Sequence, residues 1–331
     1  MSAKKIYFGQ PALPFDEFDV TAQHAAEPSV PISAAAPETA DSEVWIEADT
    51  KKPEDALTYI SFGSGSSGNS CYLGTSAGGI IIDAGIRPER IEEELKLHGI
   101  RMSHVKALLL THDHSDHVRH AYPLLRSNRH MSLYCTPRVL NGLLRRHNIS
   151  KRIKEYHTPI FKEIPFKVGR FEITAFDVPH DGSDNMGYHI AFGRHTFVLA
   201  TDLGMISERA DHYMRLANYL VIEANYDSDM LRLGRYPEYL KARIRAANGH
   251  MDNAATAAFL ADIASDHLQY VFLCHLSKDN NTPAKALKAV RDALQEKGLK
   301  VGNAEILDES RADILLMALP RFDATRRFIF R

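Results

Sequence analysis

The 331-residue chain has few cysteines and no long apolar run. Its three cysteines, Cys71, Cys135 and Cys274, form no CxxC pair. Because an odd number without that spacing does not suit a disulfide framework, we expect reduced thiols and a cytoplasmic protein. No stretch approaches the ~20 apolar residues that a membrane span needs, and no apolar secretory segment follows Met1-Ser2-Ala3-Lys4-Lys5. These absences predict a protein that does not associate with membranes.

Charge is unevenly distributed along the chain. Residues 1–56 hold eleven acidic residues against four lysines, a net −7 in a chain whose total is −2, so the remainder carries +5. The same segment is rich in Pro and Ala and has no sustained apolar period, which is typical of disorder. We therefore expect a disordered, acidic segment over residues 1–56 and one folded domain over 57–331. The overall hydrophobic content of 44% is normal for a globular protein.

One short stretch holds an unusual density of metal-ligand side chains. Thr111-His112-Asp113-His114-Ser115-Asp116-His117 directly follows the apolar run Ala107-Leu108-Leu109-Leu110. A buried strand that ends in this cluster presents imidazoles and a carboxylate at its tip. Zn²⁺, Mn²⁺ and Fe²⁺ bind such a ligand mixture. The alternative is a polar surface loop that happens to be rich in histidine.

Three later residues have the same placement at the end of an apolar run. His180 follows 171–179, Asp202 follows 196–201, and His275 follows 270–274. Each run reads as a strand, and α/β sheets usually place their sites at the carboxyl ends of strands. A single His or Asp there is more often a cap or a satisfied core polar group. Together with the first cluster, the three favour a metal site.

With its HxHxDH motif and this later order of His, Asp and His, the sequence resembles the metallo-β-lactamase superfamily from about Tyr59 to Leu316. The resemblance implies an α/β fold, the αββα four-layer sandwich, and a metal-dependent hydrolase with a metal-bridging water or hydroxide as nucleophile. It implies two divalent ions, Zn or Mn first, with Mg or Fe as alternatives. The implied ligands are His112, His114 and His180 for one ion, Asp116, His117 and His275 for the other, and Asp202 as the bridge. Asp116 is also expected to orient the nucleophile.

Three further motifs resemble one branch of that superfamily. They are Gly63-Ser64-Gly65-Ser66-Ser67-Gly68-Asn69-Ser70, Asp83-Ala84-Gly85, and His275-Leu276-Ser277-Lys278-Asp279-Asn280-Asn281-Thr282-Pro283. The combination is similar to the WalJ/YycJ type, a group described as DNA exonucleases. The substrate-binding residues predicted on this basis are Ser66, Ser67, Asn69, Ser277, Lys278 and Asn281. The Gly/Ser loop could offer backbone N–H groups to a phosphate oxygen, or it could be a plain tight turn.

A Glu–His pair supports phosphodiester chemistry. Glu223 ends the strand-like run 219–222, and His250 lies between it and His275. This order is similar to ribonuclease Z, where such a pair serves as a proton relay, so Glu223 and His250 are predicted to be catalytic. A His oriented by a carboxylate can protonate a leaving alkoxide near neutral pH. The alternative is a buried Glu that caps a helix and an unrelated surface His.

Ligand spacing and charge distribution narrow the range of possible substrates. Positions 180 and 202 lie 22 apart, and positions 202 and 275 lie 73 apart. This leaves no room for the long arm of ribonuclease Z or for the extra domain of the large ribonuclease branch. A basic segment from Arg138 to Lys154 includes Arg145, Arg146, Lys151 and Arg152. It is either an electrostatic track for a nucleic-acid backbone or a solvated helix face.

These features predict a dinuclear phosphodiesterase that acts on nucleic acid, with a DNA exonuclease as the main hypothesis. The alternatives are a small-molecule hydrolase, such as a cyclic phosphodiesterase, lactonase or thioesterase, and a metal-binding regulatory protein with weak turnover. The oligomeric state stays open. For the fold we expect helices over 88–97 and from 283 to Gly298, and strands in two groups, 57–135 and 164–225.

Overall fold

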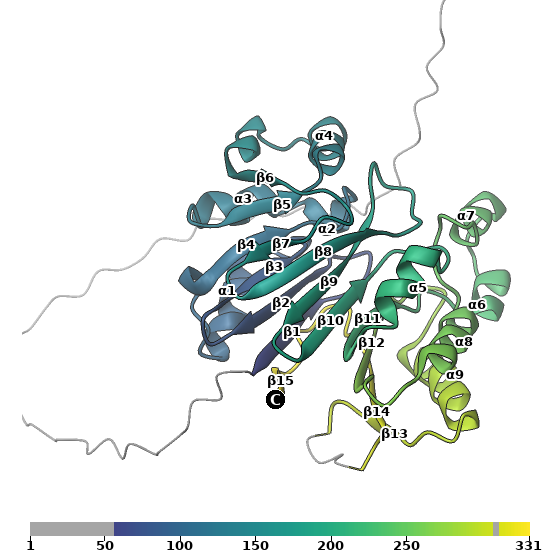
Figure 1. Ribbon diagram of the computed structural model, residues 1–331. Coiled ribbons are helices and arrows are strands. Elements are labelled where there is room, and N and C mark those ends of the chain that lie inside the picture. Colours follow the sequence, from purple (N-terminus) through teal and green to yellow (C-terminus); the bar gives the residue numbers. More distant parts are fainter. Residues whose placement is uncertain (1–55, 307–310) are drawn as a thin grey trace, which may run out of the picture. The chain divides into compact units, whose positions relative to one another are not determined.

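Two β-sheets lie face to face, and helices cover their outer faces (Figure 1). This arrangement is seen in a computed structural model that describes residues 56–306 and 311–331. The prediction of an α/β fold with four αββα layers is confirmed. The prediction of disorder over residues 1–56 falls, apart from Ala56, outside the described residues and stays a prediction.

The first sheet has seven strands and the second has eight. The first sheet, in spatial order, is β15 (Phe328–Phe330), β1 (Leu57–Gly63), β2 (Ser70–Thr75), β3 (Gly78–Ile82), β4 (Val105–Leu109), β5 (Ser132–Cys135) and β6 (His157–Pro159). The second sheet, in spatial order, is β13 (Val301–Asn303), β14 (Ile314–Ala318), β12 (Tyr270–Cys274), β11 (Tyr219–Glu223), β10 (His195–Ala200), β9 (Met186–Phe192), β8 (Phe171–Asp177) and β7 (Phe166–Val168).

The expected division of the strands was incomplete. The second sheet does not end near residue 225, because β12, β13 and β14 add to one side of it. The last strand, β15, returns to the first sheet and pairs antiparallel with β1. Strands of three residues, such as Phe328–Phe330 and Val301–Asn303, are too short to show a period of two in the sequence.

Helices lie outside both sheets and beside the strand ends. They are α1 (Pro88–Leu97), η1 (Met102–His104), α2 (Ser115–Val118), α3 (Ala121–Ser127), α4 (Pro137–Arg146), η2 (Lys151–Tyr156), α5 (Glu208–Met214), α6 (Ser228–Leu233), α7 (Glu238–Ile244), α8 (Asn253–Ile263) and α9 (Pro283–Glu296). The predicted helix over 88–97 is confirmed, with Ile91 and Leu95 buried. The helix from 283 is confirmed too: the Thr282 hydroxyl caps it, and Gly298 follows it with φ +82°.

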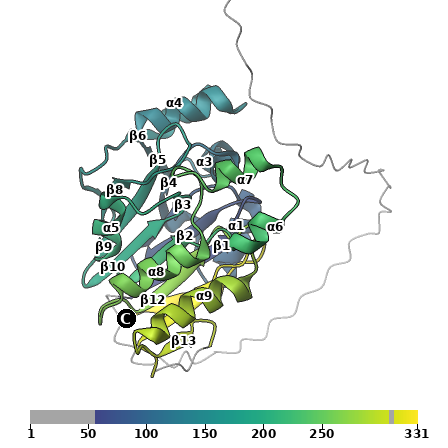
Figure 2. The same cartoon turned by 90° about the vertical axis from the view of Figure 1, so that its right-hand side faces the viewer.

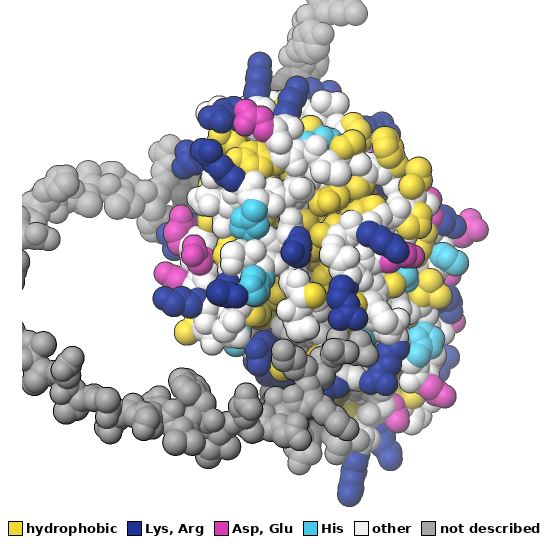
Figure 3. Space-filling view, turned by 60° about the vertical axis from the view of Figure 1, so that its left-hand side comes forward, with side chains coloured by type: hydrophobic (Ala, Val, Ile, Leu, Met, Phe, Trp, Pro, Cys, Tyr) yellow, Lys and Arg dark blue, Asp and Glu magenta, His cyan; other side chains and the backbone are white. Residues whose placement is uncertain are grey.

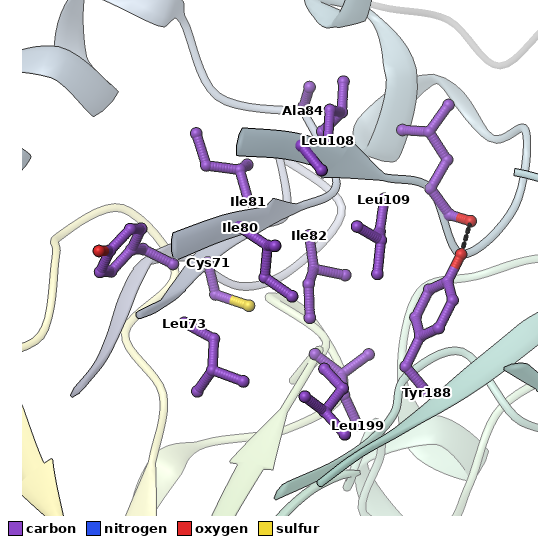
Figure 4. Packing of buried hydrophobic residues seen from close by; sticks show 14 of the residues in the cluster. Cys71, Leu73, Ile80, Ile81, Ile82, Ala84, Leu108, Leu109, Tyr188 and Leu199 are labelled. Atoms are coloured by element: carbon purple, nitrogen blue, oxygen red, sulfur yellow. Dashed lines mark hydrogen bonds between the residues drawn. The ribbon is translucent and has the colours of Figure 1, made fainter. Parts of the chain in front are cut away.

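Alternating side chains along each central strand build two cores. In β10, Phe197 and Leu199 face the first sheet, whereas Val198 and Ala200 join the core under the helices. Between the sheets, residues of β2, β3 and β4 pack toward Tyr188 and Leu199 (Figure 4). The Tyr188 hydroxyl donates a hydrogen bond to the Leu110 carbonyl oxygen at 2.6 Å, as Figure 4 shows. Each large apolar side chain buried here stabilises the fold by about 1.5–3 kcal/mol.

The parallel strands β10, β11 and β12 end at one edge of the second sheet. The residues that directly follow these strands therefore lie close together. Helices α8 and α9 pack side by side over this sheet (Figure 2). The three cysteines are buried and unbonded. None of the described helices is long and apolar enough to cross a membrane.

Candidate metal centre

The side chains predicted as metal ligands lie together at strand ends that come from both sheets. His112, His114, Asp116 and His117 follow β4, His180 follows β8, Asp202 follows β10, and His275 follows β12. The short helix α2 begins at Ser115 and carries Asp116 and His117 in one turn. The fold thus gathers residues from four strand ends into one place.

A left-handed backbone occurs at the ends of two of these strands, β10 and β12, and at the end of β3, each time at a residue other than glycine. Asp83, Asp202 and His275 have φ values of +61°, +50° and +52°. Asp and His enter this region more readily than most residues, yet the conformation still costs on the order of 1–2 kcal/mol. Such strain collects where function constrains the backbone, which agrees with the position of all three at this centre.

The first ligand group consists of His112, His114 and His180, whose donor nitrogens lie within 4.8 Å of one another. The Nε2 atom of His112 is buried without a hydrogen-bond partner, and His114 Nδ1 lies 3.2 Å from His180 Nε2. Burial lowers the pKa of all three rings, that of His114 to about 4. Neutral imidazoles with converging lone pairs, one of them unpartnered, fit a divalent metal ion.

The second group consists of Asp116, His117 and His275, again with donor atoms within 4.8 Å. Asp202 lies between the groups. Its Oδ2 is 2.9 Å from His117 Nε2, its Oδ1 is 2.9 Å from His275 Nδ1, and it also groups with His112 and His117. The two groups are therefore joined through one carboxylate, which suits a bridging ligand.

In the second group, the carboxylates and histidines strongly favour each other's charged forms. Burial alone would lower the pKa of His117, but Asp202, Asp83 and Asp116 outweigh it and raise that pKa to about 10. Burial would also lower the pKa of His275, but neighbouring carboxylates, with Asp202 having the largest effect, outweigh it and raise that pKa well above its usual value. Burial opposes the ionisation of Asp116, yet His117 and His275 bring its pKa down to about 2. Positive charge is thus strongly favoured between these carboxylates.

Asp83 is a member of the centre that the sequence reading did not recognise. Its Oδ2 lies 2.7 Å from His117 Nδ1, and it accepts hydrogen bonds from the backbone N–H and the hydroxyl of Thr111, each at 2.8 Å. A carboxylate that holds one ring nitrogen orients the other nitrogen toward a metal. The available signal was an Asp directly after the apolar run 78–82.

The structure brings Glu223 and His250 together. His250 Nδ1 lies 2.7 Å from Glu223 Oε1, and the fully buried Glu223 also accepts hydrogen bonds from the backbone N–H groups of Leu203 and Met251. Burial opposes protonation of His250, but Glu223 outweighs it and raises the His250 pKa. The pair borders Asp202, whose Oδ1 is 3.7 Å from His250 Nδ1.

Partial exposure marks the open side of the centre. The side chains of His114, Asp116 and His250 are 23%, 19% and 19% exposed, whereas that of His117 is fully buried. A reactant can therefore approach from the side where His114, Asp116 and His250 lie.

Ser66 and Ser67, predicted to bind substrate, are exposed and contact an arginine that the sequence reading did not single out for this site. Arg321 Nη1 lies 3.1 Å from the Ser66 hydroxyl, and Arg321 also donates to the Leu276 carbonyl oxygen. Gly65 allows this contact, since a Cβ there would lie 2.7 Å from Arg321 Nη1. No local sequence pattern marks Arg321 as a residue of this site, because its partners lie far away in the sequence.

The other predicted substrate residues divide into buried and exposed ones. Asn69 is buried, and its Nδ2 lies 3.1 Å from Asp116 Oδ2 and 2.9 Å from His117 Nε2. Asn281 is buried and donates to the carbonyl oxygens of Ala224 and Asn225. Ser277 is partly exposed and Lys278 is exposed. Asn69 and Asn281 thus hold ligands and loops in position, while Ser277 and Lys278 reach the surface.

Comparisons with known proteins agree with this geometry. Residues 79–275 match the family model described as "Beta-lactamase superfamily domain". The chain is 33% identical over 249 residues to "Exodeoxyribonuclease YycJ" of Bacillus anthracis, covering 75% of this chain and 93% of that protein. It is 32% identical over 250 residues to "Exodeoxyribonuclease WalJ" of Streptococcus pneumoniae, covering 75% and 92%. Among solved structures, the metallo-beta-lactamase fold protein YhfI from Bacillus subtilis matches with a TM-score of 0.56 at 15% identity, covering 83% and 100%, a likeness of fold alone.

Proposed function

Because the chain belongs to the beta-lactamase superfamily and to its YycJ/WalJ branch, we propose that it is a metal-dependent phosphodiesterase that digests DNA from an end. One observation carries the proposal: Asp202 clusters with His112 of the first ligand group, with His117 and His275 of the second, and with the Glu223–His250 pair. The names of the two relatives, which align over nearly their whole length, support DNA as the substrate.

In this proposal His112, His114 and His180 would hold one divalent ion, and Asp116, His117 and His275 would hold the other. Asp202 would contribute its carboxylate to both. The mixture of nitrogen and oxygen donors favours Zn or Mn, with Mg or Fe as alternatives. Divalent ions held there would supply Lewis-acid chemistry, since they would lower the pKa of a bound water and neutralise charge on the phosphate. Asp83 and Asn69 keep the second group in place, and the partly exposed Asp116 orients the water.

His250 acts as the general acid. Hydrolysis breaks the bond between phosphorus and the departing sugar oxygen, which leaves as an alkoxide and needs a proton. Glu223 holds one ring nitrogen of His250 and favours its protonated form, so the other ring nitrogen can donate. The His250 side chain is 19% exposed and lies at the open side, where a departing group would stand.

The exposed Gly/Ser loop forms one wall of the substrate site. Ser66 and Ser67 lie against Arg321, which ties this loop to Leu276 just after the ligand His275. Ser277 and Lys278 continue the same wall. A guanidinium held beside two hydroxyls is well suited to a phosphate oxygen.

The direct test is digestion of end-labelled DNA. Single- and double-stranded substrates, labelled at either end, are incubated with Mn²⁺, Mg²⁺ or Zn²⁺ added separately. We expect progressive shortening from one end with at least one of these metals. If DNA and RNA stay intact with every metal while a lactone or thioester is hydrolysed rapidly, the chain is a small-molecule hydrolase instead.

Loading the metal-free protein with Zn²⁺ at pH 6 should release close to two protons. His117, with a pKa of about 10, and His275, with a raised pKa, are protonated at that pH and must lose a proton to bind metal. Protons therefore compete with the ions, and affinity should rise as pH rises. Titration calorimetry in two buffers of different ionisation enthalpy measures the release. A value near zero would contradict this charge balance.

A further inference from the structure

A basic groove opens between α4 and η2, with a cavity volume of about 640 Å³. It is lined by five cationic side chains, those of Arg138, Arg145, Arg146, Lys151 and Lys154, together with Asn141, Leu144 and Ser183. Among these lining residues there is no carboxylate, and Leu144 is the one apolar side chain. Figure 3 shows Lys and Arg side chains gathered at the upper edge of the molecule, the end at which α4 lies in Figure 1.

Helical spacing explains which cations line the groove. On α4, Arg138 and Arg145 lie seven positions apart on the exposed face, while the opposite face is buried in the core. In the 3₁₀-helix η2, Lys151 and Lys154 lie three positions apart and so project on the same side. Arg152 projects elsewhere: it pairs with Glu155 at 3.1 Å and lines a different cavity. Arg152 of the predicted basic track is therefore not among the residues that line this groove.

The groove is joined to the first ligand group through Asp113, which lies between His112 and His114. The buried Asp113 carboxylate accepts hydrogen bonds from the backbone N–H and the hydroxyl of Ser183, at 2.8 and 2.7 Å. Ser183 lines the groove and follows the ligand His180 by three residues. One loop thus forms part of both the groove and the metal centre.

Helix α4 is fixed against Asp113 as well as against Ser183. His147, just after the helix, contacts the Asp113 carbonyl oxygen at 2.6 Å, and Arg146 Nε lies 3.5 Å from the Asp113 carboxylate. Gly142 permits this close approach, because a Cβ there would lie 2.1 Å from Asp113 Oδ2 and 2.3 Å from the Ser183 hydroxyl. The cations on α4 are therefore held at a set place relative to the ligands.

We propose that this groove binds the sugar–phosphate backbone of the nucleic-acid substrate, beyond the bond that is cleaved. The proposal rests on the proposed function for the identity of the substrate. Sites for small molecules are lined mainly by apolar side chains, whereas every side chain that lines this groove except Leu144 is cationic or polar. A series of cations beside a catalytic centre suits a chain of phosphates that enters it. Arg146 shares its charge with Asp113, so Arg138, Arg145, Lys151 and Lys154 carry the binding.

The test compares two double variants of the full chain. Arg145→Ala with Lys151→Ala removes two groove cations, and Lys297→Ala with Lys300→Ala removes the same charge at and just after the end of α9. Binding of a labelled DNA oligonucleotide is measured over a range of salt concentrations, with a chelator present to prevent cleavage. The slope of log K against log salt is about −0.9 per duplex phosphate contact, or about −0.7 for a single strand. In the groove variant, the slope should become less negative by nearly the amount that two phosphate contacts contribute. Its affinity for DNA near 0.1 M salt should fall by about 10–100-fold.

The metal-loaded groove variant should hydrolyse a small diester, bis(p-nitrophenyl) phosphate, at the unaltered rate. Equal loss of DNA affinity in both double variants, an unchanged slope in the groove variant, or no DNA binding by the unaltered protein would overturn the proposal. The proposed function fails separately. If DNA is bound through the groove but never cleaved, the groove stands and the exonuclease does not.

Discussion

Replacing Asp202 with alanine should abolish hydrolysis and remove at least one divalent ion from the protein. Asp202 clusters with His112 of the first ligand group, and its carboxylate oxygens lie 2.9 Å from His117 and 2.9 Å from His275 of the second group. Without it, the second group keeps two imidazoles and a single carboxylate. Since metal ions supply several kcal/mol of transition-state stabilisation and about 1.4 kcal/mol is a factor of ten, the rate should fall by more than about 10³-fold.

The measurement is metal content after dialysis, together with the rate on DNA and on bis(p-nitrophenyl) phosphate. Asp266→Ala is the matched control, because Asp266 is exposed and follows α8, away from the centre. It should keep its metal and its rate on both substrates. An Asp202→Ala protein with a full complement of metal and normal turnover would rule out the bridging role.

Replacing His250 with alanine should leave the metal content unchanged and slow DNA cleavage by about 10²–10⁴-fold, the usual range for general acid–base catalysis. The loss should be much smaller for bis(p-nitrophenyl) phosphate, because nitrophenolate leaves without a proton. In this view Glu223 acts through His250, which it holds at 2.7 Å. His212→Ala, an exposed histidine on α5, serves as the control. Equal losses on both substrates would indicate a structural role for His250.

Glu223→Gln is a less informative variant. Glu223 Oε2 accepts hydrogen bonds from the backbone N–H groups of Leu203 and Met251, and Oε1 accepts from the Asn225 side chain. Because these partners are donors, a glutamine amide would turn its own N–H groups toward at least one of them. An unsatisfied buried group costs about 1–3 kcal/mol, so this variant should lose stability as well as rate.

The sequence by itself determined the fold class and the side chains that gather at the centre. The HxHxDH spacing places four candidate ligands within one strand end and one helical turn, so their proximity is a local property of the chain. His180, Asp202 and His275 each follow a strongly apolar strand, and parallel strands in one sheet bring their carboxyl ends to one edge. The caps of α9 and the apolar spacing of α1 are equally local, and both helices were predicted correctly.

Only the tertiary structure decided which distant residues support that centre. Asp83 orients His117, Asn69 lies against Asp116 and His117, and Arg321 closes on the Gly/Ser loop across 255 positions. It also decided that Arg152 turns away from the groove. A period in the sequence shows which face of an element is buried, but contacts between elements depend on strand register and loop path. These are set by how both cores pack together, and no short stretch of the sequence records them.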